Sequence, residues 1–268
     1  MRSLLRVGLS LLVLAFVLIG LSYSVLRAQG VSTPAEGRAL ASETRSIDGA
    51  IRIVELGGPI DLTLRHGAKP SLLVRGEQRL LGNIETAQDG ELLHIATRGI
   101  VLRHRRPLEV ELVLPALTRI SVNGSGKSSV NGFSGERIKV RLDGSGRIEF
   151  NGRFKDVTAT LNGSGDLDLN AGANIDRVQA ELTGSGDLTV VGTARELHAD
   201  VTGSGDFNAR HLRADTVALK KIGSGNSDVH ARNAVSASLS GSGDVTVHGN
   251  PDQRAVSRSG SGDIRFAD

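Results

Sequence analysis

The stretch Val157-Thr-Ala-Thr-Leu-Asn-Gly-Ser-Gly-Asp-Leu-Asp-Leu169 contains the pattern that decides the fold of this chain. Apolar and polar residues alternate on both sides of a central Gly-Ser-Gly triplet. This period of two is typical of strands that bury one face, and it excludes a helix here. Because glycine adopts backbone conformations that other residues avoid, the triplet predicts a tight corner between two strands.

The Gly-Ser-Gly triplet occurs eight times, and neighbouring copies lie 18 to 21 residues apart. Apolar residues recur at even offsets on both sides of the copies, so each repeat is expected to contain half-buried strands. A fixed period of this length indicates a stacked array in which each repeat is buried by its neighbours. The first glycines of the copies are Gly124, Gly144, Gly163, Gly184, Gly203, Gly223, Gly241 and Gly260.

A second turn signal follows seven and eight residues after the first glycine, as in Asn131-Gly132 and Asn151-Gly152. Asn and Gly tolerate left-handed backbone conformations, so these pairs favour a second corner in each repeat. The sequence therefore predicts an all-β chain that forms a parallel β-helix, or solenoid, with rungs of about 19–20 residues. Less regular β-rungs are expected over residues 46–120, before the eight Gly-Ser-Gly rungs of residues 120–268.

The first 28 residues have the composition of an export signal. Arg2 and Arg6 precede an almost uncharged apolar run over residues 7–26, which is typical of a signal peptide or an uncleaved N-terminal membrane anchor. We expect a polar linker over residues 29–45 and one domain over residues 46–268. The protein is thus predicted to be exported through the inner membrane, to the periplasm, the outer membrane surface or the outside of the cell. The chain has no cysteine, so no disulfide stabilises the domain.

The net charge of +3 comes from the first 28 residues, which contain Arg2, Arg6 and Arg27 and no acidic residue. The remaining chain has 29 basic and 29 acidic residues, so it has no excess positive charge to attract nucleic acid. It also lacks Trp and Tyr, which leaves few rings to stack on bases or sugars. We therefore expect no nucleic-acid partner.

Several ordered motifs resemble one known family, the GIN domain. The motifs are Gly58–Leu64, Asn83–Thr86, Asp89–Leu92, Leu112–Pro115, Val122–Gly126, the repeated Gly-Ser-Gly-Asp and Val247–Pro251. The resemblance covers roughly residues 46–266. It implies a β-helical, exported bacterial envelope protein of adhesin-like type. The family offers no catalytic residues that could be transferred to this chain.

An aspartate follows many of the triplets, including Asp166, Asp187 and Asp206. Stacked carboxylates repel one another, and a bound calcium ion would relieve that repulsion. In the alternative interpretation, each aspartate accepts hydrogen bonds from backbone N–H groups of its own corner. We favour this alternative and predict no cofactor, with Asp166, Asp187 and Asp206 as the candidates for calcium.

The rung around Gly223 departs from the repeat pattern. Lys221 occupies an offset that is apolar in other rungs, and Asn226 replaces the usual aspartate. A β-bulge that turns Ile222 inward in place of Lys221 would explain this, and we favour it. In the functional alternative, Lys220, Lys221 and Asn226 form a ligand-facing break in the rod.

Two further groups of residues are candidate sites. Arg103, Arg105 and Arg106 belong to a dense basic cluster in a predicted loop, which either contacts anionic lipid or phosphate groups or is simply solvated. His230 and His248 occupy equivalent offsets in adjacent rungs. They either bind a transition metal or replace asparagine at an exposed corner, and we favour the second interpretation.

The repeat itself argues against catalysis, because a nucleophilic serine needs one positioned base and oxyanion hole, whereas eight equivalent serines form a ladder. We expect a non-enzymatic exported envelope or surface protein, an adhesin-like rod that binds a protein, a glycan or anionic lipid. The alternative is a scaffold that self-associates through strand edges at the rod ends, near Ile264 and Phe266. A polysaccharide-active enzyme ranks below both, since the Gly223 rung alone breaks the repeat.

Overall fold

The structure is a computed structural model that describes residues 39–98 and 107–267. Leu40–Asp268 forms one compact unit, which is the part of the chain considered below. The predicted export signal and the basic cluster of Arg103, Arg105 and Arg106 lie outside the described residues. Among the helices of the described ranges, none has the length and apolar character needed to cross a membrane.

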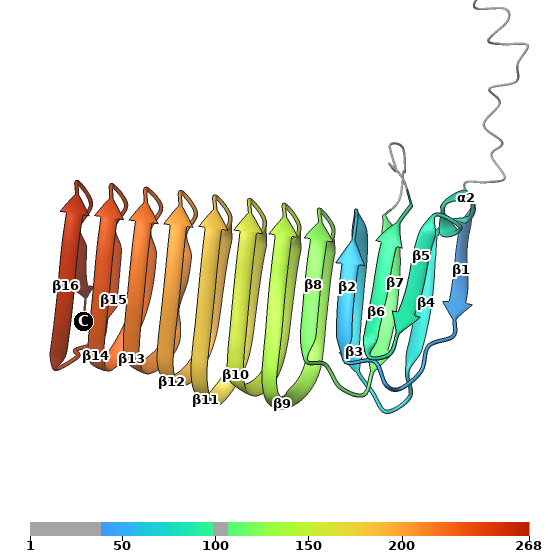
Figure 1. Ribbon diagram of the computed structural model, residues 1–268, viewed down its shortest axis with the longest axis horizontal. Coiled ribbons are helices and arrows are strands. Elements are labelled where there is room, and N and C mark those ends of the chain that lie inside the picture. Colours follow the sequence, from blue (N-terminus) through green and yellow to red (C-terminus); the bar gives the residue numbers. More distant parts are fainter. Residues whose placement is uncertain (1–38, 99–106, 268) are drawn as a thin grey trace, which may run out of the picture. The chain divides into compact units, whose positions relative to one another are not determined.

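The unit is a β-solenoid of about seven turns (Figure 1), and 76% of the described residues lie in strands and 2% in helix. This confirms the predicted all-β parallel β-helix. The first elements are β1 (Leu40–Arg45), β2 (Ile53–Gly57), β3 (Ile60–His66), β4 (Ser71–Glu77), α2 (Gln78–Leu81), β5 (Ile84–Asp89), β6 (Leu92–Thr97) and β7 (Leu108–Leu114). The later strands are β8 (Arg119–Gly124), β9 (Lys127–Gly144), β10 (Arg147–Gly163), β11 (Asp166–Gly184), β12 (Asp187–Gly203), β13 (Phe207–Gly223), β14 (Ser227–Gly241), β15 (Val245–His248), β16 (Gln253–Gly260) and β17 (Ile264–Ala267).

Each strand from β9 to β14 runs from one Gly-Ser-Gly corner through the second corner to the next triplet. Successive strands pair in parallel and stay in register on both sides of the triplet. The register shifts fall around the second corner, for example between Asn151 and Asp156. The repeats therefore absorb their differences in length at this corner, while the Gly-Ser-Gly edge remains regular.

The core is one continuous cluster of inward side chains that extends from Ile51 to Val247. Residues at the same offset stack in columns, as with Leu161, Leu182 and Val201, each of which is at most 1% exposed. Full burial of a Val or Leu side chain is worth about 1.5–3 kcal/mol, so many such columns together stabilise the stack. The even offsets identified in the sequence are thus the buried ones.

The triplet glycines are required because neighbouring corners touch through their backbones. A Cβ atom added at Gly144 would lie 2.7 Å from the Gly124 carbonyl oxygen, and one added at Gly146 would lie 2.6 Å from the Gly126 carbonyl oxygen. Gly144 also has a φ of 125°, which side-chain-bearing residues rarely adopt. The predicted corner is therefore present. A side chain is excluded there by backbone carbonyl groups of the preceding rung, not by side chains of the apolar core.

The N-terminal strands form less regular rungs that join the solenoid directly. β2 lies parallel to β6 and β8, and β3 lies parallel to β7 and β9. In contrast, β4 is antiparallel to β1 and β7, and β5 is antiparallel to β6. Gly58 and Ile60 lie beneath Gly124 and Gly126, so the Gly57-Gly58-Pro59 turn acts as the corner that precedes the first triplet.

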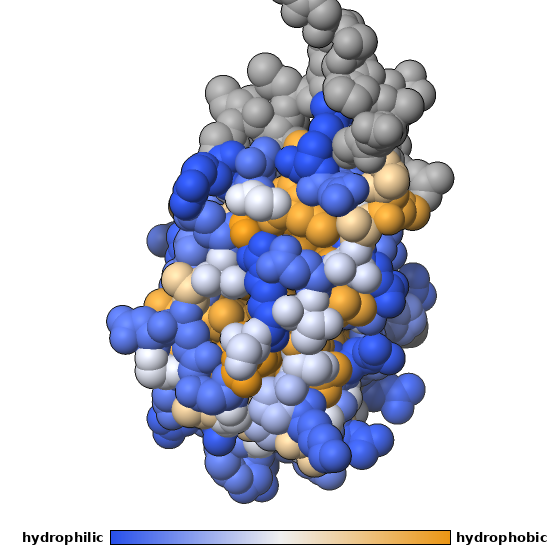
Figure 2. All heavy atoms as spheres, turned by 90° about the vertical axis from the view of Figure 1, so that its right-hand side faces the viewer, coloured by the Kyte–Doolittle hydropathy of each residue, from blue (hydrophilic) through white to orange (hydrophobic). Residues whose placement is uncertain are grey.

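The predicted linker over residues 29–45 is partly wrong, because Leu40–Arg45 forms strand β1. The strand is mostly exposed and lacks clear apolar alternation, so its sequence resembles a linker. It is ordered by its backbone pairing with β4, and the Arg45 side chain donates a hydrogen bond to the Leu81 carbonyl oxygen at 3.0 Å. Viewed from this end of the unit, hydrophilic side chains cover much of the surface and apolar side chains show between them (Figure 2).

The last rung consists of β16 and β17, and it differs from the others at its inward positions. Within the described residues, β16 pairs with β14 alone and β17 with β15 alone. Arg254 and Arg258 stand opposite Val235 and Leu239, where earlier rungs place mainly apolar residues. The Arg254 guanidinium lies 4.3 Å from the ring centroid of Phe266. Charged groups thus cover the apolar column at this end.

Candidate functional site

The structure contradicts the bulge predicted around Gly223. Lys221 keeps its register between Val201 and Leu239, and its side chain is 0% exposed, whereas Ile222 is 40% exposed. The Lys221 ammonium donates a hydrogen bond to the Gly205 carbonyl oxygen at 3.0 Å. The long flexible stem lets the amine reach this carbonyl, so the strand keeps its ladder of hydrogen bonds without a bulge.

Burial lowers the pKa of Lys221 below its ordinary value, and the charge of Asp206 opposes this shift in part. Ser227, in the same rung, is also buried, and its hydroxyl has no hydrogen-bond partner. Lys220 is exposed on the opposite face of the strand from Lys221. The predicted ligand-facing group of Lys220, Lys221 and Asn226 therefore does not form, because Lys221 points into the core.

Asn226 belongs instead to a ladder that links the corners of neighbouring rungs. Its backbone N–H donates to Asp206 Oδ1 at 2.6 Å, and its own Oδ1 accepts from the Asp244 N–H at 3.2 Å. Asp244 Oδ1 in turn accepts from the Asp263 N–H at 2.9 Å. The predicted role of these side chains as backbone acceptors is correct, but the donor lies in the following rung rather than in the same corner.

The calcium candidates do not form a common metal site. Asp166 pairs with Arg147, which also contacts Asp168 at 3.0 Å. Asp206 is engaged in the corner ladder, and the Asp187 backbone N–H donates to the Gly165 carbonyl oxygen at 3.1 Å. Within residues 39–98 and 107–267, no group of three or more His, Asp or Glu side chains is placed to hold a metal ion.

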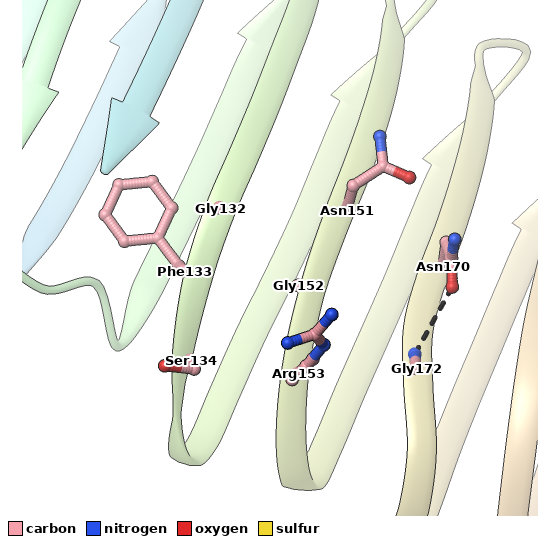
Figure 3. Close-up of a pocket in the computed structure, with 8 residues that line it drawn as sticks. All are labelled: Gly132, Phe133, Ser134, Asn151, Gly152, Arg153, Asn170 and Gly172. Atoms are coloured by element: carbon pink, nitrogen blue, oxygen red, sulfur yellow. Dashed lines mark hydrogen bonds between the residues drawn. The ribbon is translucent and has the colours of Figure 1, made fainter. Parts of the chain in front are cut away.

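Two adjoining hollows lie along the second corner and share Gly172. The first, shown in Figure 3, has a volume of about 450 Å³ and is lined by Phe133, Asn151, Arg153 and several glycines. Asn151 Nδ2 donates to Asn131 Oδ1 at 3.0 Å, so the corner asparagines of neighbouring rungs form a ladder beside it. The glycines give this hollow a floor of exposed backbone, which a ligand can approach closely.

The second hollow has a volume of about 490 Å³ and is rich in cationic and histidine side chains. Arg213, His230 and His248 occupy facing positions on successive rungs. Arg210 and His211 also line the hollow, and none of the described residues that line it carries a carboxylate. The predicted stacking of His230 and His248 is therefore observed, but the group that extends their column is Arg213, not a third metal ligand.

The electrostatics of the second hollow are dominated by positive charge. Burial lowers the pKa of His230, and the charges of Arg213, His248 and Arg232 lower it further. His248 Nε2 lies 3.4 Å from Asp228 Oδ1. The Asp228 carboxylate thus faces His248, while the repulsion that acts on His230 indicates a local excess of positive charge.

The arginines that line the two hollows have no partner, unlike most of the other described arginines. Arg177 and Arg195 bond to Glu196 and Asp176 at 3.1 Å and 3.3 Å, and most of the others also contact a carboxylate or a backbone carbonyl. In the described part of the chain, four arginine side chains have neither a hydrogen bond nor an ion pair. They are Arg119, Arg153, Arg210 and Arg213. Three of these four line the hollows at the second corner.

Two other hollows contain charges that are already paired. One is lined by Glu55, His94, Arg141 and Asp143, where Arg141 Nε lies 2.6 Å from Asp143 Oδ2. The other contains the Arg177–Glu196 pair. A ligand there would have to displace an internal ion pair. The second corner is thus the edge at which unpaired cations and surface hollows coincide.

Sequence reasoning identified the second corner as a turn and named its histidines, but it did not single out Arg153, Arg210 or Arg213. One signal was present: Asn-Gly at this corner gives way to Arg210-His211 in a later rung. Pairing could not be read from the sequence, because the carboxylate that an arginine meets comes from a neighbouring rung, as Glu196 does for Arg177. Only the stacking of rungs determines which arginines meet a carboxylate.

The fold and its glycine-cornered rungs define this protein as a β-solenoid. The chain belongs to the family described as "Putative auto-transporter adhesin, head GIN domain", whose model matches residues 52–251. This confirms the resemblance drawn from the sequence motifs. A comparison with curated protein sequences gave no match.

Several solved structures have a similar fold. A putative adhesin from Parabacteroides merdae ATCC 43184 has a TM-score of 0.79 and 17% identity, over 85% of this chain and 96% of that chain. A putative adhesin from Parabacteroides distasonis ATCC 8503 has a TM-score of 0.77 and 21% identity, over 87% and 98%. A putative lipid binding protein from the same organism has a TM-score of 0.75 and 24% identity, over 85% and 97%. At these identities the likeness concerns the fold alone.

Proposed function

We propose that this protein is an exported, non-enzymatic, adhesin-like binding protein of the bacterial envelope or cell surface. The family is described as an adhesin head domain, and two proteins of similar fold are named as adhesins. The observation that carries the proposal is the row of unpaired cationic side chains beside surface hollows at one edge. Each rung is fixed by two neighbours, so a solenoid holds such side chains at a constant spacing for a partner.

The proposed location is tested by fractionation of the source cells with an antibody against residues 120–268. Intact cells are also treated with a protease to determine whether the protein is accessible from outside. We expect the protein in an envelope or extracellular fraction, and we expect a deletion strain to attach less well to its natural surface. Recovery of the protein with a cytoplasmic marker would contradict the proposal.

A second candidate function is self-association through the last rung. It is supported by the outer edges of β16 and β17, which pair with no further strand among the described residues, and by Val256 and Phe266, which are 50% and 36% exposed. Against it, Arg254 and Arg258 place charge at the inward positions of the same rung, which is a common way to prevent strand edges from pairing. Light scattering over a range of protein concentrations tests it, because end-to-end growth raises the mass with concentration.

We do not propose a polysaccharide-active enzyme. The rung that interrupts the repeat was the candidate for chemistry, and its Lys221 is buried where a polysaccharide does not reach. A direct check is incubation of the purified protein with polysaccharides, followed by measurement of new reducing ends. Release of reducing ends above a heat-treated control would reopen the enzymatic interpretation.

A further inference from the structure

The side chains at the second corner indicate what kind of ligand the solenoid binds. We propose that the two adjoining hollows form one groove that binds an acidic polysaccharide through Arg153, Arg210, Arg213 and the histidines beside them. This inference rests on the proposed binding function and adds the chemical class of the ligand.

The side chains of Arg153, Arg210 and Arg213 have no hydrogen bond or ion pair with another described residue. The ion pairs Arg177–Glu196 and Arg195–Asp176 are examples of exposed arginines that meet a carboxylate on a neighbouring rung. Arg210 and Arg213 meet no carboxylate among the described residues, and they lie close together on β13. A guanidinium forms strong, often bidentate hydrogen bonds with carboxylate, sulfate and phosphate groups. An anionic ligand would provide these arginines with the partner that the protein does not supply.

The shape of the groove suits an extended ligand. Gly132, Gly152, Gly172, Gly192 and Gly249 line the hollows, so that much of the floor has no side chains. A bound chain can therefore lie against the backbone while its charged groups meet the arginines at the rim. Figure 3 shows Arg153 beside this glycine-lined strand region.

The cationic groups of the groove extend over several rungs. Arg153 belongs to β10 and His248 belongs to β15, so five rung intervals separate them. At a rung spacing of 4.8 Å this distance is about 24 Å. A single small anion occupies only part of such a groove, whereas a linear polymer with one acidic group per few sugar units contacts several rungs.

The surroundings of the groove favour a polysaccharide over other polyanions. A membrane surface would also need apolar side chains that insert, but the large hydrophobic side chains that are exposed in the described ranges lie elsewhere. They are Leu40, Ile222, Val256 and Phe266. Single-stranded nucleic acid is usually held by stacking on large aromatic rings, and Phe133, the phenylalanine that lines these hollows, is 1% exposed.

The test uses the purified full chain and measures binding to immobilised polygalacturonate and dextran sulfate at low salt, with neutral dextran as the reference. The double variant Arg210→Gln/Arg213→Gln removes two unpaired arginines. The matched control Arg177→Gln/Arg195→Gln removes the same charge from paired positions. We expect about a tenfold or greater loss of affinity in the first variant, because each unpaired guanidinium that is removed would take with it charge-assisted hydrogen bonds to the ligand. In the control we expect less than about a threefold change, because its arginines already use their charge internally.

Circular dichroism and the melting temperature of both variants establish that each is folded before binding is compared. Equal losses in the two variants would overturn the proposal, because binding would then follow net charge alone. Binding to neutral dextran as strong as to polygalacturonate would also overturn it. Anionic phospholipid vesicles and free inorganic phosphate form two further arms, and preference for either over both polysaccharides would contradict the inference. A failure here leaves the cell-surface location untouched, since fractionation and protease accessibility test that location separately.

Discussion

The substitution Lys221→Leu is expected to make the protein more stable, although it removes a native hydrogen bond. Lys221 lies in an inward column between Val201 and Leu239 and is fully buried. Its charged form has three N–H donors. One of these donors meets the Gly205 carbonyl oxygen at 3.0 Å. A buried donor without a partner costs about 1–3 kcal/mol. A leucine in this column would have no donor and would avoid this cost.

The size of the effect follows from three contributions. Replacement by leucine removes the cost of the buried amine, which stabilises the folded protein. Loss of the hydrogen bond to Gly205 opposes this gain by about 1 kcal/mol. The apolar stem of the lysine is already buried, so leucine gains less than the roughly 1.5–3 kcal/mol of a newly buried side chain. We expect a net increase of about 1–3 kcal/mol in the free energy of unfolding at pH 7, which raises Tm by about 2–12 °C for a domain of this size.

The pH dependence provides a sharper criterion than the stability at one pH. The pKa of Lys221 is lowered in the folded protein from the ordinary value of 10.5. As pH falls below about 10.5, the unfolded chain takes up a proton that the folded protein does not, so the wild type loses stability until the folded-state pKa is reached. The leucine variant has no such loss. Its advantage over the wild type should therefore be largest near neutral pH and smaller at pH 10.

Urea unfolding of the wild type, Lys221→Leu and Lys220→Leu at pH 7 and pH 10 measures these differences. Lys220 is the exposed neighbour of Lys221, so its replacement should change the stability by less than about 0.5 kcal/mol at either pH. A Lys221→Leu variant that is less stable than the wild type at pH 7 would refute the reasoning. A stability difference that is equal at the two pH values would refute the assignment of the cost to the buried amine.

Three further predictions concern the corners, the last rung and the groove. Gly144→Ala should lower the free energy of unfolding in urea by about 2–4 kcal/mol, because position 144 has a positive φ and the added methyl group would clash with the Gly124 carbonyl oxygen. The control Gly82→Ala should have little effect, since the space around Gly82 is open. Arg258→Leu should increase the mass measured by light scattering at high protein concentration, since it restores an apolar inward position next to the outer strand edge of the last rung. A variant that stays monomeric would contradict the idea that Arg258 prevents association at this edge. Binding of polygalacturonate should strengthen as pH falls from 8 to 5, because His230 has a lowered pKa and gains its positive charge towards the acidic end of this range. An affinity that does not change with pH would argue against a role of His230 in the groove.

The sequence by itself determined the architecture, because its information is periodic. Alternation through stretches such as Val157–Leu169 identifies the inward residues, and the recurring triplet identifies the corner. Both signals are local, and each follows from the requirement that a strand bury one face and turn without a steric clash. The N-terminal strand β1 escaped this reasoning because backbone pairing, not apolar alternation, orders it.

The tertiary structure decided everything that depends on which groups meet across rungs. Lys221 could have pointed inward or outward, and only the continuous register from Val201 to Leu239 places its amine at the Gly205 carbonyl. Whether an arginine is paired, as Arg177 is, or free, as Arg213 is, depends on the neighbour stacked about 4.8 Å away. The spacing of the repeats in the sequence determines that rungs stack, but the register shifts at the second corner determine which side chains face one another. For this reason the sequence specified the solenoid, and the stacking specified the groove.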